Sequence, residues 1–131
     1  IVERVKFLGM QPHESIAGMM MRSQVGVVPL PLSGFPEARL FCCPLKALEL
    51  MAAGTPIVAS DLHAVRGLLK HSENAWLVKP DDAKALATGI SEVLENQELR
   101  NRLIAGGLQS AQELSYDARA RKILEFARSV W

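Results

Sequence analysis

Lys46 and Glu49 stand one helical turn apart near the start of a predicted helix. They lie in the stretch FCCPLKALELMAAGTPIVAS, residues 41–60, which indicates a helix that ends at Gly54 and is followed by a buried strand. Because the N-terminal end of a helix is already positive, a lysine in the first turn calls for a negative group nearby. Glu49 can be that group in an ordinary solvated ion pair, worth about 0.3 kcal/mol. A bound anion is the alternative.

The residues at the predicted helix start bear on this choice. Pro44 suits the first helical position, because that position needs no N–H and the ring pre-sets φ. Cys43 would then be the N-cap, and it lacks the side-chain oxygen that usually accepts an N–H of the first turn. A phosphate could accept the N–H groups of Leu45 and Lys46, with a charge-assisted contact from the lysine. Glu49 could then accept two hydroxyl groups, as from a ribose. The local residues alone leave both interpretations open.

Two other groups of residues are candidates for a function. Met19, Met20 and Met21 could form an adaptable binding surface, but methionines at helical spacing are more typical of a core. Asp61 and Lys79 lie at the ends of two predicted strands, as in the phosphorylated site of two-component receiver domains. That site also needs acidic residues after the first strand to hold Mg²⁺, and this position reads Gly-Met-Gln-Pro. The receiver-like signalling domain is therefore a distant alternative.

The composition is typical of one soluble globular domain spanning residues 1–131. Hydrophobic residues make up 49% of the chain, enough to bury a core, and the net charge of +1 argues against a nucleic-acid-binding protein. No apolar run of about 18 residues predicts a membrane span, and no signal peptide is recognisable. The two cysteines are adjacent, which predicts reduced thiols and a cytoplasmic location. The histidines and cysteines show no ligand spacing, so no metal site is predicted.

The order of hydrophobic runs predicts an α/β fold with a parallel sheet. Strand-like runs alternate with helical segments, and their near-continuous apolar character suggests strands covered on both faces. This alternation implies a Rossmann-like sheet with flanking helices, right-handed crossovers and extra C-terminal helices. We expect about four strands, at 4–9, 25–30, 56–60 and 75–79, and helices at 13–23, 44–53, 63–70, 82–95, 97–113 and 115–129.

One long irregular segment, residues 30–43, leaves the second predicted strand and leads into the helix that carries Lys46. Loops of this length in compact domains are usually functional or mobile. Ligands of open α/β sheets bind outside the carboxyl ends of the strands. A binding site is therefore expected where this loop leaves the sheet.

Three stretches, VKFLGMQPHESIAGMMMRSQVGVVPL, PLKALELMAAGTPIVASDLHAVRGLL and NAWLVKPDD, resemble the C-terminal domain of family 4 glycosyltransferases. The matches run in order from Phe7 to about Tyr116, and PLKALELMAAGTPIVAS is the most specific of them. The resemblance implies the GT-B fold, in which two Rossmann-like domains face each other across the active-site cleft. It also implies a retaining glycosyltransferase that uses a nucleotide-diphosphate sugar donor, of the UDP or GDP type, and needs no metal or other cofactor.

The resemblance assigns binding residues but no catalytic residue. In the family, backbone N–H groups at the start of this helix bind the donor diphosphate, a glutamate holds the ribose hydroxyls, and the loop after FLG lies near the base. The matching residues are Cys43, Leu45 and Lys46 for the diphosphate, Glu49 for the ribose, and Met10 and Gln11 for the base.

Phe41 is the main departure from the family pattern. It stands eight residues before Glu49, where the family's E-x7-E motif has its first glutamate. That glutamate contacts the donor sugar, so neither the sugar nor the detailed geometry around it is indicated here. Glu37 lies in the same predicted loop, at a spacing that does not match the motif.

Two parts of the family's proteins have no counterpart in this chain. Two strands upstream of FLG carry the arginine and lysine that clamp the diphosphate, and an N-terminal domain binds the acceptor. The chain starts at Ile1 without an initiator methionine, so we expect a piece of a longer enzyme that does not transfer sugar by itself. Detectable transfer from any nucleotide-sugar would contradict this expectation.

An open sheet edge invites self-association. The alternative function is a truncated interaction module without catalysis, and membrane contact is not indicated either way.

Overall fold

The computed structural model describes residues 2–32 and 44–130. Their sheet has three parallel strands in the order β1–β2–β3, namely β1 (Gly26–Val28), β2 (Ile57–Ser60) and β3 (Trp76–Val78). Val27 is paired with Val58, and Ala59 with Leu77. The parallel α/β architecture predicted from the sequence is confirmed.

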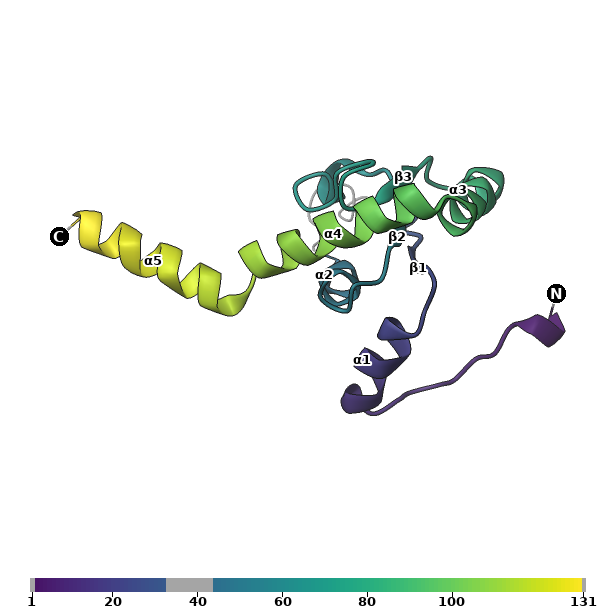
Figure 1. Cartoon of the computed structure of the whole chain (residues 1–131), viewed down its shortest axis with the longest axis horizontal. Helices are drawn as coiled ribbons and strands as arrows, with labels where there is room; N and C mark the ends of the chain where they lie inside the picture. Colours follow the sequence, from purple (N-terminus) through teal and green to yellow (C-terminus); the bar gives the residue numbers. More distant parts are fainter. Residues whose placement is uncertain (1, 33–43, 131) are drawn as a thin grey trace.

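Helices connect and cover these strands (Figure 1). The α-helices are α1 (His13–Met21), α2 (Leu45–Ala52), α3 (Ala83–Glu95), α4 (Gln97–Glu113) and α5 (Tyr116–Val130), and the short 3-10 helices are η1 (Val2–Arg4) and η3 (His63–Val65). Asp82 caps α3 by accepting the N–H of Ala85, and Asn96 caps α4 by accepting the N–H of Leu99. No helix in the described part of the chain is both long enough and apolar enough to cross a membrane.

The core lies on both faces of the sheet because neighbouring residues of a strand point to opposite sides. Ile57 and Ala59 of β2 pack with Leu50 and Met51 of α2. On the opposite face Val58 packs in a second cluster, with Val93, Leu99 and Leu103 of α3 and α4. The sheet is thus covered on both sides, as the continuous apolar strands predicted. Of the three methionines predicted as core, Met20 is buried, whereas Met21 is 64% exposed.

The predicted strand at 4–9 is wrong. Arg4 ends η1, and the residues from Val5 to Gly9 form no regular structure. Val5 is 50% exposed and Phe7 92% exposed. A strand needs a neighbour to accept and donate its backbone hydrogen bonds, and the described residues offer this segment none. Within residues 2–32 and 44–130 the sheet therefore has three strands rather than about four.

Two predicted helices also differ from the structure, one at its start and one at its end. Pro44, with φ −75° and ψ 86°, is the N-cap of α2 rather than its first residue, so Cys43 is not the cap. The carbonyl of Pro44 already accepts the N–H of Ala47 at 2.8 Å, as an N-cap carbonyl does. The helix predicted at 63–70 is reduced to η3 followed by hydrogen-bonded turns. Gly67 in that stretch is a poor helix former, which explains the early end.

Candidate functional site

The ion pair predicted at the start of α2 is present. Lys46 Nζ lies 2.9 Å from Glu49 Oε2, and the two side chains are 54% and 41% exposed. Pro44 has no side-chain group that could cap the helix. Lys46 is therefore neutralised by Glu49 while both side chains remain open to solvent. An exposed pair of this kind adds little stability, so it is free to rearrange around a ligand.

A groove of about 270 Å³ runs between α1 and α2. Most of its lining is apolar, and the polar exceptions are His13 from the first residue of α1 and Glu49 from α2. The lining residues are His13, Ile16, Ala17, Met20, Met21, Glu49, Ala52 and Ala53. The hydroxyl of Thr55 donates to the carbonyl of Met20 at 2.6 Å and is buried. This bond ties the end of α1 to the residues that follow α2, which holds the two sides of the groove together.

A second hollow, of about 290 Å³, lies at the carboxyl ends of the strands. Residues at or just after the ends of all three strands contribute to it, among them Pro29 after β1, Ser60 at the end of β2 and Lys79 after β3. This is the edge at which open α/β sheets bind ligands. The structure thus has hollows both at the expected edge and beside Glu49.

The predicted binding residues are brought together only in part. Leu45, Lys46 and Glu49 share α2, and Leu45 is an exposed side chain, so any role in binding falls to its backbone. Met10 is fully exposed. Gln11 is partly buried, and its side-chain amide donates to the carbonyl of Leu8. Cys43 and Phe41 lie outside the described residues.

His13 is the residue of this region that sequence reasoning missed. It stands two residues after Gln11 and begins α1, and it faces the same groove as Glu49. The one sequence signal was its place just after Pro12, at the predicted start of the helix. Nothing in the residue pattern linked it to α2, because the link is made by packing.

Asp61 and Lys79, the residues of the receiver alternative, are both engaged locally. Asp61 accepts two hydrogen bonds from Arg66, one from Nε at 2.8 Å and one from Nη2 at 2.9 Å. The Arg66 hydrogen bond is the main reason that the pKa of Asp61 lies below its usual range. Lys79 Nζ lies 3.7 Å from Asp82 Oδ2. No group of three or more His, Cys, Asp or Glu residues is placed to hold a metal within the described ranges.

Comparison with known proteins gives a family match over most of the chain. The family model described as "Glycosyl transferases group 1" matches residues 1–110. The chain is 32% identical to the phosphatidyl-myo-inositol mannosyltransferase of Mycobacterium leprae, over 99% of this chain and 33% of that protein. It is 33% identical to the D-inositol 3-phosphate glycosyltransferase of a Nocardioides species, over 64% of this chain and 18% of that protein. The chain therefore spans a third or less of the length of these curated relatives.

Solved structures agree with the family match. The sucrose-phosphate synthase of Thermosynechococcus elongatus superposes with a TM-score of 0.79 at 30% identity, over 98% of this chain and 30% of that one. The Anabaena protein Alr3699/HepE, solved in complex with UDP, gives a TM-score of 0.76 at 22% identity, over 98% of this chain and 33% of that one. At the lower identity the likeness is one of fold alone.

Proposed function

This chain belongs to the glycosyl transferases group 1 family, and we propose that it is the part of a GT-B glycosyltransferase that binds the nucleotide-sugar donor. The observation that carries the proposal is the exposed Lys46–Glu49 pair at the start of α2, beside a groove that Glu49 helps to line. The proposal concerns the activity of a whole glycosyltransferase. This chain covers 33% of the length of the mannosyltransferase relative.

The spacing of the pair suits a nucleotide laid along α2. A helix rises about 1.5 Å per residue, so Lys46 and Glu49 are offset by about 4.5 Å along the axis and can contact successive parts of a ligand that lies along α2. The diphosphate lies against the first-turn N–H groups and Lys46. Glu49 turns from Lys46 to accept the two ribose hydroxyls. Lys46 then pairs with the phosphate charge that replaces its carboxylate partner.

The donor is a nucleotide-diphosphate sugar of the UDP or GDP type, and binding uses no metal. Among relatives, the Anabaena protein was solved with UDP, and the mannosyltransferase is named for phosphatidyl-myo-inositol. The UDP complex supports a nucleotide donor, and neither name identifies the sugar or the acceptor of this protein. Catalysis requires two cleft walls that position both substrates, so transfer belongs to the whole enzyme.

Titration calorimetry of the chain with UDP, GDP and ADP tests the proposal. We expect Glu49→Ala to weaken binding of every nucleotide about tenfold or more, because each shares the ribose hydroxyls. Glu92→Ala is the matched control, since Glu92 is an exposed glutamate of α3. Equal affinities of Glu49→Ala and the unchanged chain would refute the assignment of the ribose.

A second candidate, a non-catalytic interaction module, is favoured by one observation, which is Phe41 in place of the sugar-contacting glutamate. A folded sample that binds none of the three nucleotides would support this candidate. We further propose that the chain self-associates through the side of β1 that has no strand partner among the described residues.

A further inference from the structure

The groove between α1 and α2 has a polar end and an apolar end. His13 begins α1, and Glu49 is the other polar side chain that lines the groove. Toward the far end lie Met20, Ala52 and Ala53. The bond between Thr55 and the carbonyl of Met20 fixes this far end, so the polar end is the one that faces the start of both helices.

This distribution matches the chemistry of a nucleoside. A nucleobase has two apolar faces and a polar edge, and the attached ribose presents two hydroxyl groups. Ligand pockets combine a mainly apolar lining with a few polar groups that fix orientation. If Glu49 holds the ribose, the base must lie within reach of the groove, where Ile16 and Ala17 offer apolar contact. Glu49 and His13 are the polar side chains that line the groove. With Glu49 on the ribose, His13 can contact the edge of the base.

We propose that His13 is a specificity-determining residue that hydrogen-bonds the edge of the donor's base. The inference rests on the proposed function, because it takes the nucleotide position from Glu49. A neutral imidazole has one N–H donor and one acceptor nitrogen. The edges of uracil, guanine and adenine differ in their donors and acceptors, so a contact with His13 favours one of them. Contacts with ribose and phosphate are common to all three and give no such preference.

The experiment compares five forms of the chain: unchanged, His13→Ala, His13→Gln, Glu49→Ala and a control variant. The ligands are UDP, GDP, ADP and ribose 5-phosphate, which has no base. Calorimetry measures the nucleotide affinities, and NMR shift titration measures the weaker ribose 5-phosphate. His63→Ala is the matched control, because His63 is an exposed histidine of η3 and lies outside the groove lining.

We expect His13→Ala to weaken the preferred nucleotide about tenfold and to level the affinities of the three nucleotides, while ribose 5-phosphate binds as before. His13→Gln, whose amide offers both a donor and an acceptor, should keep a preference among the bases. Glu49→Ala should weaken all four ligands and leave the order of the nucleotides unchanged. His63→Ala should bind like the unchanged chain.

The outcomes separate this inference from the function on which it rests. If His13→Ala keeps the full preference among nucleotides, or weakens ribose 5-phosphate equally, His13 does not contact the base and the inference fails alone. If the unchanged, folded chain binds no nucleotide, the inference and the proposed function both fail. Exposure of His13 at a helix start makes a folding defect in its variants unexpected, and their circular dichroism spectra check this point.

Discussion

At the scale of single residues, the Asp61–Arg66 pair is the clearest electrostatic feature outside the proposed site. The hydrogen bond from Arg66 is the main cause that lowers the pKa of Asp61, partial burial opposes it, and the charges of Arg66 and His71 add to the lowering. Because the pKa is lower in the folded than in the unfolded chain, the stabilisation is present above the unfolded-state pKa. It is lost as the pH falls through the folded-state pKa.

Replacing Arg66 with alanine should therefore raise the pKa of Asp61 toward its ordinary value. The dependence of stability on acid pH should become weaker at the same time, because the folded and unfolded pKa values approach each other. NMR titration of the Asp61 carboxyl group measures the shift. Arg128→Ala, on α5, is the control and should leave Asp61 unchanged. An unmoved pKa in Arg66→Ala would show that the hydrogen bond does not hold in solution.

Residue-level prediction from sequence succeeded where partners share one element. Lys46 and Glu49 are three positions apart on a helix, and this spacing alone brings their side chains together. His13 and Glu49 lie on different helices, and only the packing of α1 against α2 brings them to one groove. No local pattern contains that information.

At the scale of elements, the backbone of α4 at Gly106 packs closely against the backbone of Glu73, in the turn before β3. A Cβ on Gly106 would lie 2.2 Å from the carbonyl oxygen of Glu73. Next to it, the buried Asn74 donates to the hydroxyl of Ser110 at 2.9 Å and accepts the N–H of Lys70 at 2.7 Å. The helix can make these contacts because it carries glycine at the point of approach.

Gly106→Ala should lower the free energy of unfolding by about 1–3 kcal/mol, as expected for overpacking against backbone that cannot move aside. Gly67→Ala is the matched control, because a Cβ there has no atom within 4 Å, and its stability should not fall. Chemical denaturation followed by circular dichroism measures both variants. Equal stability of the two would mean that α4 shifts at negligible cost.

Element prediction was best where the sequence carries its own start and stop signals. The helix predicted at 97–113 is α4 with the same bounds, and the capping residue Asn96 precedes it. The strand predicted at 4–9 has strong strand formers but failed, because a strand also depends on a neighbour supplied from elsewhere. Whether a neighbouring strand is present cannot be predicted from the residues of the segment itself.

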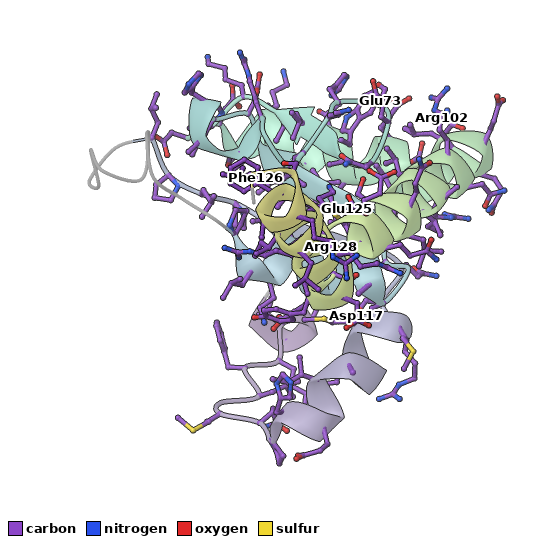
Figure 2. All side chains as sticks on the ribbon, turned by 90° about the vertical axis from the view of Figure 1, so that its left-hand side faces the viewer. Glu73, Arg102, Asp117, Glu125, Phe126 and Arg128 are labelled. Atoms are coloured by element: carbon purple, nitrogen blue, oxygen red, sulfur yellow. The ribbon has the colours of Figure 1, made fainter. Side chains whose placement is uncertain are left out.

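At the scale of the whole molecule, the chain has a packed centre and two extensions. α5 reaches toward one end of the long axis and the N-terminal segment toward the other (Figure 1). None of the residues of α5 is buried in the described structure. Figure 2 shows Phe126 on one side of α5 and Asp117, Glu125 and Arg128 on the other. The sequence predicted a helix at 115–129, but that prediction does not say what its apolar side meets.

The proposed self-association follows from two features that fit each other. Within the described residues β1 pairs only with β2, so its other side has no strand partner, and Val27 is 38% exposed. The segment from Val5 to Leu8 is rich in strand formers and is exposed. Addition of this segment from one copy to β1 of another would satisfy the backbone groups of both.

Sedimentation velocity over a range of protein concentrations tests this association. We expect the average mass to rise with concentration in the unchanged chain and to rise less in Phe7→Lys, because a lysine there disfavours burial of the added strand. Tyr116→Lys is the control for loss of an exposed aromatic residue, since Tyr116 is 90% exposed and lies on α5. If association is unaffected by Phe7→Lys but lost in Tyr116→Lys, the contact runs through α5 instead. If the unchanged chain stays a single copy at every concentration, neither surface pairs with itself and the proposed self-association is refuted.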